Sequence, residues 1–138
     1  MIKIVKAIIH KNNKYLLQLR DNKPNISSPN TWGFFGGGVD SGETHKDALI
    51  RELEEELSWK PKNIEFFYAD YELNTKWFSV YCDSPTNNLN LMEGQDMKWF
   101  ESKEINRLKN TPDIVHNIIN KYEKLISYDD KNIIKVNS

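Results

Sequence analysis

The most constraining feature of this sequence is an acidic segment that directly follows three consecutive glycines. From Asp40 to Leu57 the chain carries seven acidic and two basic residues, a formal charge of −5, whereas the whole chain of 138 residues carries −1. Apolar residues recur at helical spacing in this segment, which predicts a helix from about Thr44 to Leu57. Like charges at that spacing destabilise a helix, so the concentration of carboxylates requires a reason.

An α-helix turns by about 100° per residue, and this places two kinds of side chain on separate faces. One stripe consists of leucines and the adjacent stripe of glutamates: Leu49, Leu53 and Leu57 beside Glu52, Glu55 and Glu56. The leucines are expected to face the core. The glutamates fit either a solvated helix surface or a site for a hard cation such as Mg²⁺, which prefers carboxylate and carbonyl oxygens. The helix alone leaves both interpretations open.

Composition excludes several classes of protein. The charged and hydrophobic fractions, 28% and 38%, are typical of a globular chain, and we expect residues 1–138 to form a single domain. A net charge of −1 argues against a nucleic-acid partner. No apolar run approaches the ~20 residues of a membrane span, and the first residues lack the features of a signal peptide. The single cysteine, Cys82, favours a reducing, cytoplasmic location.

Strand-like segments lie on both sides of the acidic helix. They are rich in β-branched and aromatic residues and cover residues 2–10, 15–20, 64–73, 76–82 and 97–100. A second amphipathic helix is expected after Pro112. Its apolar stripe comprises Ile114, Val115, Ile118, Ile119, Tyr122 and Leu125. The tail from Tyr128 onward is ambiguous. This order predicts an α/β fold in which helices cover a mixed sheet.

The spacing of the acidic segment favours the cation site. Gly37 is followed after five residues by Glu43, and after seven more by the run Arg51-Glu52-Leu53-x-Glu55-Glu56. This pattern resembles the Nudix box of the Nudix hydrolase family. The resemblance implies a Nudix-type α/β/α sandwich with a mixed β-sheet between helices. It also implies a hydrolase that uses Mg²⁺ or Mn²⁺ to cleave the pyrophosphate linkage of a nucleoside triphosphate or a nucleoside diphosphate derivative.

The same resemblance assigns roles to the residues of the box. It places metal ligands at Gly37, through its carbonyl group, and at Glu52, Glu55 and Glu56, and it makes Glu52 and Glu55 candidates for activating water. Arg51 would orient these carboxylates, and Glu43 would stabilise the junction between loop and helix. The identity of the general base and the number of metal ions stay open.

A second resemblance lies downstream, in Glu93-Gly94-Gln95-x-x-x-Trp99. The antimutator branch of the family, which hydrolyses oxidised guanine nucleoside triphosphates, has a similar segment. Glu93 is therefore expected as a further metal ligand or water-activating base. Its alternative is a loop glutamate without such a role, and Asp96 is the next candidate.

Three further residues are candidates for binding the small-molecule nucleotide. Arg20 ends a strand where relatives often contact phosphate, and the alternative is an exposed arginine at a strand end. Phe34 would stack on the base or pack beneath the glycine loop. Asn110, in Asn110-Thr111-Pro112, matches the position of a base-reading asparagine in that branch, and it fits equally well the start of the last helix.

The sequence departs from the family pattern at the end of the box, where Ser58 stands in place of a glycine that usually ends the helix in a left-handed turn. Ser58 must adopt that conformation or let the helix continue. An alternative function is also open: a catalytically inactive Nudix-fold module that binds or senses a nucleotide. Which nucleotide is bound is not readable from the sequence. Exposed aromatic residues would permit a homodimer.

Overall fold

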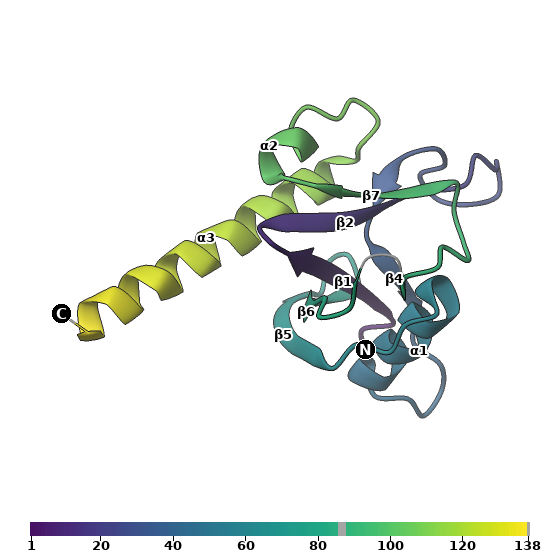
Figure 1. Cartoon of the computed structure of the whole chain (residues 1–138). Helices are drawn as coiled ribbons and strands as arrows, with labels where there is room; N and C mark the ends of the chain where they lie inside the picture. Colours follow the sequence, from purple (N-terminus) through teal and green to yellow (C-terminus); the bar gives the residue numbers. More distant parts are fainter. Residues whose placement is uncertain (86–87, 138) are drawn as a thin grey trace.

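The computed structural model describes residues 1–85 and 88–137, with side chains up to residue 127 (Figure 1). Its elements are β1 (Ile4–Lys11), β2 (Lys14–Leu19), β3 (Trp32–Gly33), β4 (Phe35–Gly38), α1 (His45–Leu57), β5 (Asn63–Asp70), β6 (Thr75–Tyr81), β7 (Asp96–Phe100), α2 (Ser102–Ile105) and α3 (Asp113–Asn137). Within these ranges, no helix combines the length and the apolar character needed to cross a membrane.

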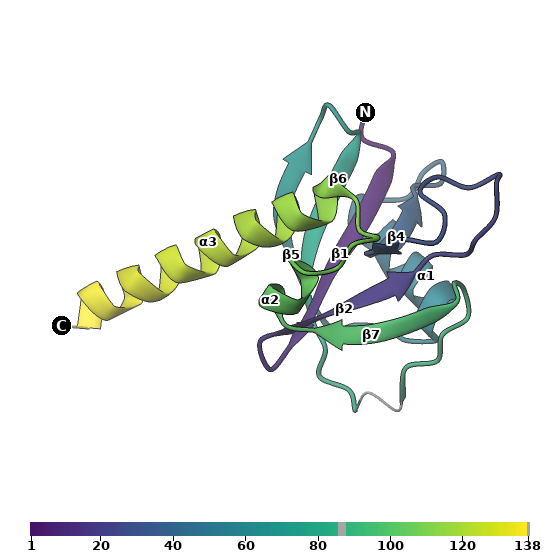
Figure 2. The same ribbon diagram turned by 90° about the horizontal axis from the view of Figure 1, so that it is seen from above.

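The strands form one mixed sheet in the order β3-β2-β1-β6-β5, to which β4 adds beside β1 and β7 beside β2. The pair of β1 and β6 is parallel and the other pairs are antiparallel. β1 and β2 pair only near their hairpin, where Asn12 and Asn13 take the positive φ angles of a tight two-residue turn. From there the two strands diverge, and β4 lies along the opposite half of β1 (Figure 2).

α1 begins and ends at residues that satisfy its backbone. The Thr44 hydroxyl accepts a hydrogen bond from the Asp47 N–H at 3.1 Å and caps the first turn. The helix ends at Ser58, which adopts the left-handed conformation with φ 53° and ψ 40° and donates its N–H to the Glu54 carbonyl. Of the two alternatives for the helix end, the left-handed turn is therefore the one adopted. The leucine stripe is fully buried against one face of the sheet.

α3 covers the opposite face of the sheet. Val115, Ile118, Ile119 and Tyr122 are buried there, which confirms the expected mixed sheet between helices. The helix continues past the sheet to Asn137, so the ambiguous tail is helical (Figures 1 and 2). The expectation that Leu125 would join the apolar stripe is wrong: its side chain is 44% exposed. The later part of α3 extends beyond the sheet (Figure 2).

The glycine stretch forms a strand, β4, which the composition of the segment had not predicted. Gly36 pairs with Lys6 of β1 and has a φ of 147°. A Cβ atom at Gly36 would lie 2.1 Å from the Val5 carbonyl oxygen, so only glycine permits this close pairing. A second difference is the end of β5: the strand stops at Asp70 and not at residue 73, because residues 71–74 form the turn into β6.

Candidate active site

Arg51 is the centre of a polar network at the start of α1. Its guanidinium binds the Glu43 carboxylate through two hydrogen bonds, of 2.8 Å from Nε and 3.0 Å from Nη2. The Nη2 group also donates to the Gly38 carbonyl at 2.9 Å, and Nη1 donates to Glu52 at 3.0 Å and to Glu55 at 3.3 Å. These bonds lower the pKa of Glu43. One side chain thereby joins the glycine loop to two of the glutamates predicted to form the site.

Glu43 also holds the loop that leads into α1. Its Oε1 accepts a hydrogen bond from the Asp40 N–H at 2.8 Å, in addition to those from Arg51. The loop and the first turns of the helix are therefore fixed to each other through one carboxylate. This contact is the one that the resemblance implied for Glu43.

Glu56 is buried, in contrast to Glu55, whose side chain is 59% exposed. Its Oε1 accepts a hydrogen bond from the Gly36 N–H at 3.0 Å. Burial raises the pKa of Glu56 to about 8, with further contributions from the charges of Glu93 and Glu52. A carboxyl group with this pKa is mainly protonated at neutral pH, because the protein alone stabilises its charged form poorly.

Glu52 lies directly against Gly37. A Cβ atom at Gly37 would meet the Glu52 carboxylate at 2.4–2.6 Å, so the missing side chain provides the space that this carboxylate occupies. Burial raises the pKa of Glu52, although the hydrogen bond from Arg51 opposes that change. The charges of Glu55 and Glu93 act in the same direction as burial. Gly37 and Glu52 are thus neighbours in space, as the box spacing predicted.

Glu93 reaches the same region from a loop between β6 and β7. The Gln18 side chain, buried in β2, donates a 2.8 Å hydrogen bond to the Glu93 carbonyl, and the Met92 N–H donates to the Glu56 carbonyl at 2.9 Å. The charge of Glu93 contributes to the raised pKa values of both Glu52 and Glu56. The structure therefore brings Glu93 and the α1 glutamates together. Asp96, the fallback candidate, uses its own carboxylate to accept the Met97 N–H at 2.8 Å.

The chemistry of this cluster fits a divalent cation. Its donors are carboxylates, the ligands that Mg²⁺ prefers. Burial, together with the charges of Glu93 and Glu52, raises the pKa of Glu56, and a bound cation would favour its charged form. Among the described residues, no three acidic, histidine or cysteine side chains are already gathered as a ready metal cage. Glu52 and Glu55 are held by Arg51, and Glu56 is held by Gly36. Binding a cation would therefore require these carboxylates to turn away from part of their present contacts.

Lys6 is a charged member of the site that the sequence reasoning did not single out. It lies in β1, and its Nζ donates to the Phe34 carbonyl at 3.4 Å. Burial lowers the pKa of Lys6, while the charges of Glu56, Glu52 and Glu93 oppose that change. A signal was present in the sequence: Lys6 interrupts a strand of β-branched residues at the position that shares a face with buried Ile8.

A cavity of about 220 Å³ lies between the sheet and the start of α3. Glu52, Glu56 and Glu93 do not line it, but their charges act on Lys6, which does. Lys6 and Arg20 line it together with aromatic side chains that include Phe34 and Trp77. The Phe34 and Trp77 rings meet edge to face, with their centroids 5.2 Å apart. Phe34 is packed in the core under α3 and also forms part of the cavity wall. Stacking of Phe34 on a base stays a prediction.

Arg20 and Asn110 are held by the loop between β2 and β3. The Arg20 Nε donates to the Ser27 carbonyl at 3.0 Å, and the Arg20 side chain also borders a smaller cavity that Glu93 lines. The Asn110 side-chain amide donates to the Asn30 backbone carbonyl at 3.2 Å, and the Asn110 backbone carbonyl accepts a hydrogen bond from the Trp32 N–H. Asn110 does not belong to the lining of the 220 Å³ cavity, which Pro112 lines instead.

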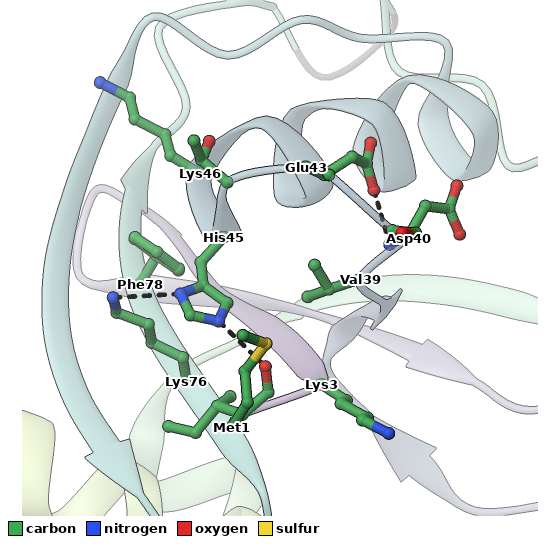
Figure 3. Close-up of a pocket in the computed structure, with 13 residues that line it drawn as sticks. Met1, Lys3, Val39, Asp40, Glu43, His45, Lys46, Lys76 and Phe78 are labelled. Carbon is green, nitrogen blue, oxygen red and sulfur yellow. Dashed lines mark hydrogen bonds between the residues drawn. The ribbon is translucent and has the colours of Figure 1, made fainter.

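A second, larger cavity of about 970 Å³ lies at the amino-terminal end of α1 (Figure 3). His45 is one of its lining residues. One ring nitrogen contacts the Ile2 carbonyl at 3.0 Å, and the other lies 3.4 Å from the Lys76 ammonium. Asp40 and Glu43 line this cavity, but Glu52, Glu56 and Glu93 do not. Unlike the 220 Å³ cavity, it is also not lined by Lys6 or Arg20, the two cationic residues that connect to the acidic cluster.

Comparison with known proteins places this geometry in context. The family model described as NUDIX domain matches residues 3–120. An RNA pyrophosphohydrolase from Francisella tularensis subsp. mediasiatica is 31% identical over 98 residues, which cover 68% of this chain and 56% of that protein. The chain thus spans about half the length of the curated relatives that it matches.

Solved structures share the fold at lower identity. A C. elegans Ap4A hydrolase, crystallised as a binary complex, superposes with a TM-score of 0.71 at 21% identity, covering 91% of this chain and 98% of that one. A MutT protein from Methanosarcina mazei Go1 superposes with a TM-score of 0.66 at 20% identity, covering 89% and 93%. At these identities the likeness concerns the fold alone.

Proposed function

Because the chain belongs to the NUDIX domain family, we propose that it is a hydrolase that cleaves the pyrophosphate linkage of a nucleoside triphosphate or a nucleoside diphosphate derivative with the help of Mg²⁺ or Mn²⁺. One observation carries the proposal: two cationic side chains, Lys6 and Arg20, connect the acidic cluster of Glu52, Glu56 and Glu93 to a cavity with aromatic walls. The charges of the three glutamates act on Lys6, and Arg20 also lines the smaller cavity that Glu93 lines. A nucleotide has the matching parts, a flat base and a charged phosphate chain.

The residues proposed to hold the divalent ion are the Gly37 carbonyl and four carboxylates, those of Glu52, Glu55, Glu56 and Glu93. When bound, the ion neutralises the diphosphate and lowers the pKa of the attacking water. Arg51 keeps Glu52 and Glu55 in place through its hydrogen bonds to both. Glu52, Glu55 and Glu93 are the candidates for taking the proton of the water.

The proposed substrate contacts follow from the cavity. Phe34 and Trp77 provide an aromatic wall for the base, and Arg20 places a guanidinium between that wall and the cavity that Glu93 lines.

Asn110 would act indirectly, because its amide holds the 21–31 loop through Asn30. An Asn110→Ala variant should therefore weaken binding of all bases to a similar extent. Selective loss of one base would instead support direct reading by Asn110.

A substrate panel tests the proposed function. The purified protein is incubated with Mg²⁺ and with nucleoside triphosphates, dinucleoside polyphosphates, nucleotide sugars and an RNA carrying a 5′-triphosphate, and released phosphate and pyrophosphate are measured. We expect turnover of at least one small nucleotide, and its loss with EDTA. The RNA is included because the curated relatives bear the name RNA pyrophosphohydrolase. Turnover of the RNA alone would overturn the proposed class of substrate.

The competing function is a module that binds a nucleotide without cleaving it. The carboxylates of the box and Arg51 are all present, and Arg51 binds those of Glu43, Glu52 and Glu55, which favours an enzyme. Calorimetry separates the two functions: tight nucleotide binding without turnover of any compound in the panel would favour the binding module.

Glu93→Gln, compared with Asp96→Asn, tests which downstream acid belongs to the site. Only the Glu93 change should lower both Mn²⁺ affinity and turnover.

A further inference from the structure

Lys6 lies between the two parts of the candidate site, which are the acidic cluster of Glu52, Glu56 and Glu93 and the cavity with aromatic walls. On β1 it pairs with Gly36 of β4 on one side and with Trp77 of β6 on the other. Val5 and Ala7 belong to the core under α1, whereas Ile8 belongs to the core under α3. Because side chains alternate along a strand, Lys6 points to the α3 side, where the 220 Å³ cavity lies and where it forms part of the lining.

The sheet geometry explains how one side chain can be near both parts. β1 and β2 separate after their hairpin (Figure 2), and the half of β1 that contains Lys6 pairs with β4 instead. Glu56 reaches the same place from α1, because its carboxylate accepts the Gly36 N–H and Gly36 is the strand partner of Lys6. The charges of Glu56, Glu52 and Glu93 all act on the Lys6 ammonium, and so does that of Arg20.

The positive charge of the Lys6 ammonium group is poorly compensated by its contacts. An ammonium group has three hydrogen-bond donors, and Lys6 uses one of them on the Phe34 carbonyl at the long distance of 3.4 Å. Among the described residues, no carboxylate lies within 4 Å of its Nζ. Burial lowers the pKa of Lys6, and the charges of the neighbouring glutamates oppose that change without offsetting it. A partly buried ammonium without a contacting anion is costly. A lysine kept there for structure alone would be expected to contact Glu56.

We propose that Lys6 binds the phosphate group nearest to the base-binding cavity, so that it positions the phosphate chain between the aromatic wall and the acidic cluster. This inference rests on the proposed nucleotide hydrolase function. A phosphate oxygen at this place would accept the remaining N–H donors of Lys6. Arg20, which lines the same cavity from β2, would provide the second cation. The two side chains would hold an anionic chain that the neighbouring carboxylates would otherwise repel.

The rival explanation is that Lys6 only balances the charge of the acidic cluster in the metal-free protein. The two roles differ in what a neutral side chain would do. If Lys6 binds phosphate, its loss weakens nucleotide binding. If it only balances charge, its loss strengthens binding of a divalent cation, because a competing positive charge has gone, and nucleotide affinity stays as it was.

The test uses Lys6→Met, which keeps a long apolar stem, and Lys6→Gln as a second neutral variant. Lys3→Met is the matched control, because Lys3 is exposed and does not line the 220 Å³ cavity. Calorimetry measures the affinity for three ligands: a non-hydrolysable nucleoside triphosphate analogue with Mg²⁺, the corresponding nucleoside without phosphate, and Mn²⁺ alone. Circular dichroism checks that each variant is folded.

We expect both Lys6 variants to bind the triphosphate analogue at least tenfold more weakly, and to bind the nucleoside as the wild type does. In turnover assays KM should rise more than kcat falls, because the contact is to the bound phosphate chain. Lys3→Met should leave all three affinities unchanged. Unchanged affinity for the analogue in a folded Lys6 variant would overturn the inference. If the wild-type protein binds no nucleotide at all, the proposed function fails and the role of Lys6 fails with it.

Discussion

The Gly36 N–H donates a 3.0 Å hydrogen bond to Oε1 of the buried Glu56. This bond joins the glycine strand β4 to the carboxylate stripe of α1, and it is the only hydrogen bond that the described structure gives to the Glu56 carboxylate. A buried acid with one neutral donor retains its proton to an unusually high pH. Much of the behaviour of the metal-free protein should follow from this pair.

The first prediction concerns pH. The pKa of Glu56 is raised to about 8 in the folded protein, from 4.5 for an ordinary glutamate. Between these pH values the folded state holds a proton that the unfolded chain has released, so the free energy of unfolding falls as pH rises, in total by roughly a few kcal/mol. Glu56→Gln should remove this dependence. Urea unfolding at pH 5 and pH 8 with EDTA measures it, and Glu54→Gln, an exposed change on the same helix, should retain it.

A second prediction sets activity against stability for the same substitution. Glutamine keeps an oxygen for the Gly36 N–H, so metal-free Glu56→Gln should be at least as stable as the wild type at pH 8. Turnover should fall by about a hundredfold or more, because a neutral amide is a poor ligand for Mg²⁺. Steady-state kinetics with the substrate found in the panel measures this loss. Full turnover by the variant, or its unfolding without metal, would show that Glu56 is a structural residue.

The third prediction contrasts two adjacent glycines. Gly36→Ala should destabilise the protein by roughly 2 kcal/mol or more, because the new Cβ would collide with the Val5 carbonyl and the backbone has a positive φ. Gly37→Ala would meet only the end of the flexible Glu52 side chain. It should fold with nearly unchanged stability but bind Mn²⁺ and turn over substrate more weakly. Equal destabilisation by the two changes would contradict this assignment.

Arg51 provides the fourth prediction. Lysine at this position keeps the charge but cannot reproduce the hydrogen bonds to Glu43, Glu52 and Glu55. Loss of such an orienting group typically lowers metal affinity or activity by about 10- to 100-fold. We expect a loss of that size in Mn²⁺ affinity for Arg51→Lys, measured by calorimetry. Lys60→Met, which removes a surface partner of Glu54, serves as the control and should change nothing. An Arg51→Lys variant with normal affinity would mean that the network does not position the ligands.

The end of α1 gives a fifth prediction, which concerns stability alone. Ser58 has a left-handed backbone that costs a residue with a side chain about 1 kcal/mol relative to glycine. Ser58→Gly should therefore raise the free energy of unfolding by roughly 0.5–1 kcal/mol and leave turnover unchanged. Ser58→Ala retains the strain and should give no gain. Urea unfolding distinguishes the two variants, and equal stability of both would argue against the left-handed turn.

Local sequence patterns predicted those parts of the protein that depend on local chemistry. The acidic helix was expected from about Thr44 to Leu57 and spans His45–Leu57, because capping by Thr44 and the leucine stripe are both local features. The turn at Asn12 and Asn13 is likewise a local feature, because asparagine tolerates the positive φ that both residues adopt. The spacing of the glutamates indicated a common site with Gly37, and the structure places Glu52 against that glycine.

Features that depend on the tertiary fold were missed. β4 is a strand because β1 lies beside it, and three glycines have no strand propensity of their own. In the sequence, Lys6 cannot be distinguished from the other lysines of the amino-terminal strand. Its role becomes visible only when the partners of that strand are known. The exposure of Leu125 depends on where the sheet ends, and periodicity along a helix contains no information about that.

The parallel pairing of β1 and β6 has a consequence for the order in which the protein assembles during synthesis. The β1–β2 hairpin closes over a two-residue turn and can form as soon as it leaves the ribosome. β4 follows as a second neighbour of β1, but β6, the neighbour on the other edge, is made about seventy residues later, because Ile4 pairs with Thr75. Such long-range pairing is slow. Until then the leucines of α1 lack part of the surface that they cover. The acidic cluster should therefore form late, when Glu93 has been made and can join the glutamates of α1.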